Sequence, residues 1–178
     1  QPVLTIVGGS LGASTLNAIA LAAARQIPRN WQILWITGPR FHEEVMADLG
    51  EVPEGVCVVD YENRMQDAYA ASTLVVARAG SSTLSELTAL GKPALLIPSP
   101  NVTDNHQEAN ARGLEKEGAC WVLVEEGLNI PEAVTTIEQH LNDAEALSTM
   151  AAASKSQGRL EVANHVADLL INRFDPAS

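Results

Sequence analysis

The feature that most constrains the fold is a steady alternation of short apolar runs with helix-forming segments. Six runs rich in Val, Ile and Leu predict strands at Val3–Val7, Trp31–Thr37, Val56–Val59, Leu74–Ala77, Ala94–Ile97 and Cys120–Val124. Helical periodicity fills the intervals at Ser14–Gln26, Phe41–Leu49, Met65–Ala71, Ser82–Leu90 and Asn105–Glu117, and three more helices are expected at Pro131–Leu141, Ala144–Ala153 and Arg159–Arg173. Strands that alternate with helices pair in parallel through right-handed crossovers. The sequence therefore predicts an α/β fold with a Rossmann-like, doubly wound, six-stranded parallel sheet.

Composition agrees with such a sheet. Hydrophobic residues make up 46% of the 178 residues and aromatic residues only 4%, so the core must consist mostly of Ala, Val, Leu and Ile. Small aliphatic side chains suit strands covered by helices on both faces. We expect one domain over residues 1–174 and a frayed tail at 175–178. The chain starts almost directly on a predicted core strand, as a cut at a domain boundary would leave it.

Charge and cysteine content limit the possible partners. The formal net charge of −11 argues against binding to nucleic acid or to anionic lipid. No apolar run reaches transmembrane length, and no signal peptide opens the chain. Cys57 and Cys120 lie in apolar runs without metal-binding spacing, so we expect buried free thiols in a reducing, cytoplasmic compartment, with a disulfide as the lesser alternative.

The segment after the fourth predicted strand has features of a phosphate site. The run Leu74–Ala77 reaches a glycine turn, and three hydroxyl residues then open a helix: Ser81, Ser82 and Thr83. Free backbone N–H groups and the helix dipole favour a phosphate there. Glu86 follows one turn later and could hold the hydroxyl pair of a ribose. The alternative is structural, because Thr83-x-x-Glu86 also matches a capping box.

A second strand–glycine loop–helix unit stands at the beginning of the chain. Gly8–Ala13 connects the first strand to the first helix. Ser10 and Ala13 occupy positions where the dinucleotide fingerprint needs glycines, so an NAD site is not indicated. In a doubly wound sheet, ligands bind outside the carboxyl ends of the strands, near the switch in strand order. The loops after the first and fourth strands should flank that switch. A tight turn without a ligand remains the alternative for Gly8–Ala13.

A third polar segment follows the fifth predicted strand and enters a helix. Gln107 and Asn110 are three residues apart on one helix face, and their amides suit sugar hydroxyls. The structural alternative makes Asp104 a helix N-cap and leaves both amides in solvent. A metal site formed by Asp104, His106 and Glu108 is disfavoured, because their alternating spacing at a helix start scatters the side chains.

Together these segments resemble a known enzyme family. Gly8–Ala13, Arg78–Glu86 and Pro98–Ala111 resemble, in order and spacing, loops of the MurG family of bacterial N-acetylglucosaminyltransferases. The resemblance covers essentially the whole chain, but only the carboxyl-terminal, donor-binding half of that two-domain GT-B fold. The family's amino-terminal acceptor domain is not in this sequence.

The resemblance implies a UDP-GlcNAc site built from all three loops. It places the donor diphosphate at Ser10 and at the hydroxyl residues Ser81, Ser82 and Thr83. It places the ribose hydroxyls at Glu86.

The same resemblance assigns the two ends of the donor. Gln107 and Asn110 match the amides that contact the GlcNAc hydroxyls. The uracil contact comes from backbone after the third strand, around Glu62, where the family often has an apolar residue.

The implied reaction transfers GlcNAc from UDP, with inversion, to the C4 hydroxyl of the lipid-linked muramoyl pentapeptide, converting lipid I to lipid II. No metal or other cofactor is expected, and no catalytic residue is assigned in this chain, because His106 is given a positioning role. The base and the lipid I contacts are expected in the missing domain. The full-length protein would lie on the cytoplasmic face of the plasma membrane.

Three other functions stay open at this point. The chain could belong to another UDP-sugar enzyme of the GT-B class. It could be a noncatalytic donor-binding subunit that needs a membrane partner. It could also be part of a sugar-nucleotide epimerase with similar architecture.

Overall fold

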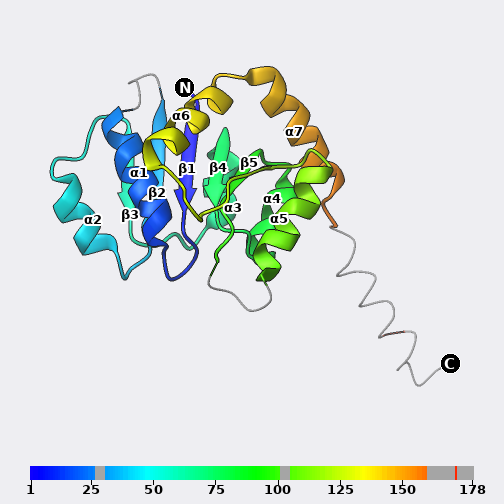
Figure 1. The fold of residues 1–178 in the computed structure, drawn as a ribbon, viewed down its shortest axis with the longest axis horizontal. Coiled ribbons are helices and arrows are strands. Elements are labelled where there is room, and N and C mark those ends of the chain that lie inside the picture. Colours follow the sequence, from blue (N-terminus) through cyan, green and yellow to red (C-terminus); the bar gives the residue numbers. More distant parts are fainter. Residues whose placement is uncertain (27–30, 101–104, 160–170, 172–178) are drawn as a thin grey trace.

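The fold is a doubly wound parallel sheet, seen in a computed structural model that describes residues 1–26, 31–100, 105–159 and 171. The strands pair in the order β3-β2-β1-β4-β5-β6, and every pairing is parallel, which confirms the predicted sheet. Their bounds are β1 Val3–Val7, β2 Gln32–Ile36, β3 Val56–Val59, β4 Leu74–Ala77, β5 Ala94–Leu96 and β6 Trp121–Val122. Figure 1 shows the strands side by side between two groups of helices.

Helices cover both faces of the sheet. One apolar core lies under α1 (Ser14–Gln26), α2 (His42–Leu49) and α6 (Ile130–Leu141). The other lies under α3 (Met65–Ala71), α4 (Ser81–Leu90) and α5 (His106–Lys116). Helix α7 (Ala144–Ser156) contacts both α6 and α4 and so joins the two layers (Figure 1). The expected helix over 159–173 and the expected tail at 175–178 fall almost wholly outside the described residues.

Burial explains why the strands are apolar along their whole length. Leu4 and Ile6 pack into the first core, whereas Val7 packs into the second, so β1 needs apolar side chains in both directions. Residues Leu74–Ala77 of β4 are all buried for the same reason. Central parallel strands covered on both sides carry this continuous pattern instead of an alternating one.

The switch in strand order lies between β1 and β4. Chain-successive strands extend from β1 in one direction and from β4 in the other, so α1 and α4 lie on opposite faces of the sheet. Both helices start at the carboxyl edge, which is the lower edge in Figure 1. The loop before α1 turns through Gly12, whose φ is 75°. A Cβ atom there would lie 2.4 Å from the carbonyl oxygen of Thr37, so only glycine allows this approach to the end of β2.

One expectation about the cysteines is wrong. Both thiols are free, and Cys120 is buried, but Cys57 is exposed. Cys57 lies on β3, an edge strand whose other residues are only partly buried, so its apolar run does not imply burial. Burial, followed by the charge of Glu115, raises the pKa of the Cys120 thiol to about 12. None of the helices in the described part of the chain is long and apolar enough to cross a membrane.

Candidate functional site

A cavity of about 190 Å³ opens at the carboxyl edge of the sheet, beside the switch point. Five of the eight predicted site residues line it: Ser10, Glu62, Ser82, Thr83 and Glu86. They come from the loop after β1, the loop after β3 and the first turns of α4. The structure therefore brings the predicted diphosphate, uracil and ribose positions together, although they are far apart in the sequence.

The start of α4 leaves backbone donors available at this cavity. Gly80 is the N-cap, in extended conformation, and its carbonyl accepts from the N–H of Leu84 at 3.0 Å. Ser81, Ser82 and Thr83 are thus the first three helical residues, whose N–H groups have no acceptor within the helix. The capping-box interpretation is wrong, because Thr83 lies inside the helix and not at its N-cap.

Tyr69 of α3 forms part of the cavity wall and was missed by sequence reasoning. Its side chain is only 2% exposed and lies beside Thr83 and Glu86. Burial, and then the charge of Glu86, raises the pKa of the Tyr69 phenol to about 12, while a hydrogen bond with Thr83 works in the opposite direction. The phenol is therefore neutral at physiological pH. A buried tyrosine needs a polar partner, but the sequence does not say which one.

Glu62 shapes the loop after β3. Its carboxylate accepts from the backbone N–H of Arg64 at 2.7 Å, and Asp60 accepts from the N–H of Tyr61 at 2.8 Å. Both carboxylates are thus used to hold the backbone between β3 and α3. Glu62 reaches the cavity as part of this loop, together with Tyr61 and Met65.

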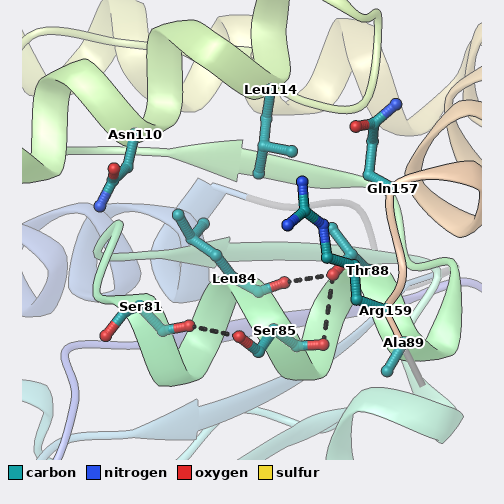
Figure 2. Close-up of a pocket in the computed structure, with 9 residues that line it drawn as sticks. All are labelled: Ser81, Leu84, Ser85, Thr88, Ala89, Asn110, Leu114, Gln157 and Arg159. Carbon is teal, nitrogen blue, oxygen red and sulfur yellow. Dashed lines mark hydrogen bonds between the residues drawn. The ribbon is translucent and has the colours of Figure 1, made fainter. Parts of the chain in front are cut away.

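The remaining predicted residues are placed elsewhere. Ser81 and Asn110 line a second cavity of about 370 Å³, between α4 and α5. Figure 2 shows Asn110 and Leu114 on α5 across from Leu84 on α4. Arg159 lies toward the end of the cavity that is away from Asn110. Because Ser81 and Ser82 are consecutive, the two cavities flank the first turn of α4.

Gln107 does not line either cavity. Its side-chain oxygen accepts from the backbone N–H of Ser99 at 3.0 Å, which holds the loop after β5 against α5. Asp104, the proposed N-cap, lies outside the described residues, and Asn105 is the N-cap of α5. Among the residues that the structure describes, no three His, Cys, Asp or Glu side chains are grouped as metal ligands would be.

A second set of polar residues that the sequence did not reveal lies at the same edge. Arg78 forms an ion pair with Glu125, and its Nη1 also donates to the carbonyls of Ile97 at 3.0 Å and Pro98 at 3.1 Å. Burial acts to raise the pKa of Glu125, but hydrogen bonds from Arg78 and Thr15 and the charge of Arg78 outweigh it and lower that pKa. The sequence signal was weak, since Glu125 stands in an ordinary acidic loop.

Comparison with known proteins is consistent with this geometry. The model of the glycosyltransferase family 28 C-terminal domain matches residues 3–166. The chain belongs to this family.

Two of its relatives carry informative names. A UDP-N-acetylglucosamine–N-acetylmuramyl-(pentapeptide) pyrophosphoryl-undecaprenol N-acetylglucosamine transferase from Listeria welshimeri is 39% identical over 174 residues, which is 96% of this chain and 48% of the relative. The crystal structure of Acinetobacter baumannii MurG matches 97% of this chain and 52% of its own with a TM-score of 0.85 and 29% identity. The chain spans about half the length of the curated relatives it matches.

A more distant likeness concerns the fold alone. A putative UDP-N-acetylglucosamine 2-epimerase from Listeria monocytogenes matches 98% of this chain and 45% of its own with a TM-score of 0.75 and 16% identity. The glycosyltransferase family 28 domain thus shares its architecture with proteins of another reaction class, and function must be argued from the site.

The raised pKa of Tyr69 gives a testable pH dependence. In a Tyr61→Phe variant, which leaves one of the two tyrosines, tyrosinate absorbance should rise near pH 12 and not near the ordinary value of 10.0. Because the folded state holds this proton more tightly, its contribution to stability is complete below pH 10 and is lost as pH rises toward 12.

The matched control for this titration is Tyr69→Phe, in which that part of the alkaline loss of stability should be missing. Circular dichroism at each pH establishes that the chain is still folded. Titration of Tyr69 near its ordinary pKa in the folded chain would contradict its burial in the cavity wall beside Glu86.

Proposed function

We propose that this chain is the donor-binding half of an inverting N-acetylglucosaminyltransferase. The full protein would transfer GlcNAc from UDP-GlcNAc to the lipid-linked muramoyl pentapeptide in peptidoglycan synthesis. The observation that carries the proposal is the convergence of Ser10, Ser82, Thr83 and Glu86 in one cavity at the switch point. The family match and the names of the relatives support the same donor.

The nucleotide would lie across the first turn of α4. The free N–H groups of Ser82 and Thr83, together with the helix dipole, favour a diphosphate at this position. Ser10 faces the same space from the loop after β1. Glu86, one turn further along α4, then meets the ribose hydroxyls, and the backbone around Glu62 meets the uracil.

The sugar would extend to the other side of the same helical turn. Ser81 and Asn110 line the cavity between α4 and α5, directly beside the proposed diphosphate position. Gln107 uses its side-chain oxygen on Ser99, so its NH₂ group is the part that can donate to a sugar hydroxyl. This arrangement assigns the nucleotide and the GlcNAc to separate cavities.

The chemistry of this half would be stabilisation of the leaving group. Departure of UDP places negative charge on the diphosphate, where the amides of α4 and the hydroxyl residues can stabilise it. The base for the incoming hydroxyl, the contacts to lipid I and the attachment to the cytoplasmic face of the membrane are assigned to the amino-terminal half. Donor binding would need neither a metal ion nor another cofactor.

The first test concerns the ribose. Glu86→Gln should weaken both UDP and UDP-GlcNAc by roughly tenfold, because a charge-assisted hydrogen bond becomes a neutral one. Isothermal titration calorimetry measures both affinities. Glu62→Gln is the matched control in the same cavity, since the amide oxygen of the glutamine can still accept from the backbone N–H of Arg64. Unchanged UDP binding with a lower melting temperature would make Glu86 a purely structural residue.

The second test separates sugar from nucleotide. Asn110→Ala should leave UDP affinity unchanged and weaken UDP-GlcNAc by about fivefold, the value of one neutral hydrogen bond. Gln107→Ala should also reduce the preference for UDP-GlcNAc over UDP and over UDP-GalNAc. Gln157→Ala, at the far end of the same cavity, is the control and should change neither affinity. Equal losses for UDP and UDP-GlcNAc would remove Asn110 from the sugar site.

The third test concerns turnover. This chain should bind UDP-GlcNAc in the presence of EDTA and transfer no GlcNAc to a lipid I analogue. Transfer should appear when it is joined to the amino-terminal half of a relative, such as the Listeria welshimeri protein. Transfer by the chain alone would overturn the assignment and direct the search for a base to His42, His106, His140 and His165.

The same joined protein distinguishes the other functions. Preference for a different sugar nucleotide or acceptor would indicate another UDP-sugar transferase. Formation of the C2 epimer of UDP-GlcNAc would indicate an epimerase. Activity that requires a separate membrane protein would indicate a noncatalytic donor-binding subunit.

A further inference from the structure

One carboxylate connects the loops on the two sides of the switch point. Thr15 Oγ1 donates to one oxygen of Glu125 at 2.5 Å, and Arg78 pairs with the other oxygen. Thr15 is in the first turn of α1, Arg78 follows β4, and Glu125 follows β6. Segments that are far apart in the sequence therefore meet at a single side chain.

The arginine extends this connection to a further strand. Besides its ion pair with Glu125, Arg78 donates to the carbonyls of Ile97 and Pro98, directly after β5. The carboxyl ends of β4, β5 and β6 and the start of α1 are thus tied together. We name this set, comprising Thr15, Arg78 and Glu125, the carboxyl-edge bracket.

We propose that Glu125 is a positioning residue that sets the distance between the starts of α1 and α4, and thereby the diphosphate site between them. This inference rests on the proposed function. Thr15 follows the glycine loop that carries Ser10, and Arg78 lies two residues before the N-cap of α4. A shift of either contact would move the phosphate-facing loop next to it.

The environment of the bracket makes it stiff enough for this role. The side chains of Arg78 and Glu125 are 14% and 20% exposed, so water screens their attraction only partly. Charge-assisted hydrogen bonds are short and directional, and Glu125 makes one with each oxygen. Small displacements of groups that bind a ligand have large effects on binding and catalysis, which is why supporting contacts matter.

A contrasting ion pair shows what the bracket adds. Arg64 and Asp67 lie on one turn of the chain and are 73% and 52% exposed, so their contact connects no separate segments. Such pairs contribute little. Asp67→Asn removes one carboxylate charge near the same edge without touching the bracket, which makes it the matched control for charge.

The experiment compares UDP with uridine on the whole chain. Glu125→Gln should weaken the binding of UDP by about tenfold and leave the binding of uridine nearly unchanged. The reason is that Glu86 and the loop after β3 hold the nucleoside independently of the bracket. Calorimetry measures the affinity for UDP, and protein NMR titration measures the affinity for uridine. A merely stabilising role would lower the melting temperature without changing the ratio of the two affinities.

Three further variants make the result decisive. Thr15→Val keeps the Arg78–Glu125 pair and should weaken the binding of UDP by about threefold, again without an effect on the binding of uridine. The double variant that combines Thr15→Val with Glu125→Gln should lose no more UDP affinity than Glu125→Gln alone, because Thr15 acts on the site through Glu125. Ser72→Ala removes a buried hydroxyl that is bonded to Thr5 at 2.6 Å and precedes the amino end of β4, so it should lower stability and leave UDP affinity intact.

The outcomes separate the two proposals. If the unmodified chain binds neither UDP nor uridine, the proposed function fails and the positioning role fails with it. If the chain binds UDP but Glu125→Gln and Thr15→Val keep the original ratio of UDP to uridine affinity, only the positioning role is overturned. A selective loss of UDP affinity in both variants, absent from Asp67→Asn and Ser72→Ala, supports it.

Discussion

The parallel pairing of β1 with β4 is the constraint on which the rest of the structure depends. Their register runs from Leu4 opposite Leu74 to Val7 opposite Ala77, so both strands end at the same level. Each strand then enters a helix on a different face of the sheet. The loop before α1 and the first turns of α4 therefore line one cavity at the carboxyl edge, where ligands bind in such sheets. The proposed diphosphate site depends on this register, because it brings the two loops to the same level.

A site formed in this way explains how an acidic chain could hold an anionic donor. The formal net charge is −11, and Arg78, a cation at this edge, is already paired with Glu125. Attraction for a diphosphate would therefore come from backbone dipoles at the start of α4 and from hydroxyl groups, and not from net positive charge. Such donors are fixed by the fold, so their geometry needs support. The carboxyl-edge bracket is the support that the structure offers.

The sequence predicted local features well, but it predicted contacts between distant segments poorly. Apolar runs between helices gave the bounds of β1, β3 and β4 without error, because strands buried on both faces leave a continuous signal. The motif around Ser82 and Glu86 predicted a site at the carboxyl edge of the sheet, and both residues line a cavity there. The capping-box alternative and the burial of Cys57 could be decided only when the N-cap and the strand order were known.

Contacts between distant segments could not be predicted for a physical reason. The ion pair of Arg78 with Glu125 joins residues 47 apart, and nothing in either local sequence encodes the partner. The same holds for Tyr69, whose neighbours Thr83 and Glu86 belong to a different helix. Motifs record which groups face a ligand, whereas the contacts that hold those groups in place depend on how the strands are ordered. In this fold, local sequence motifs therefore predict the residues that would bind the donor. They do not predict the residues that position them.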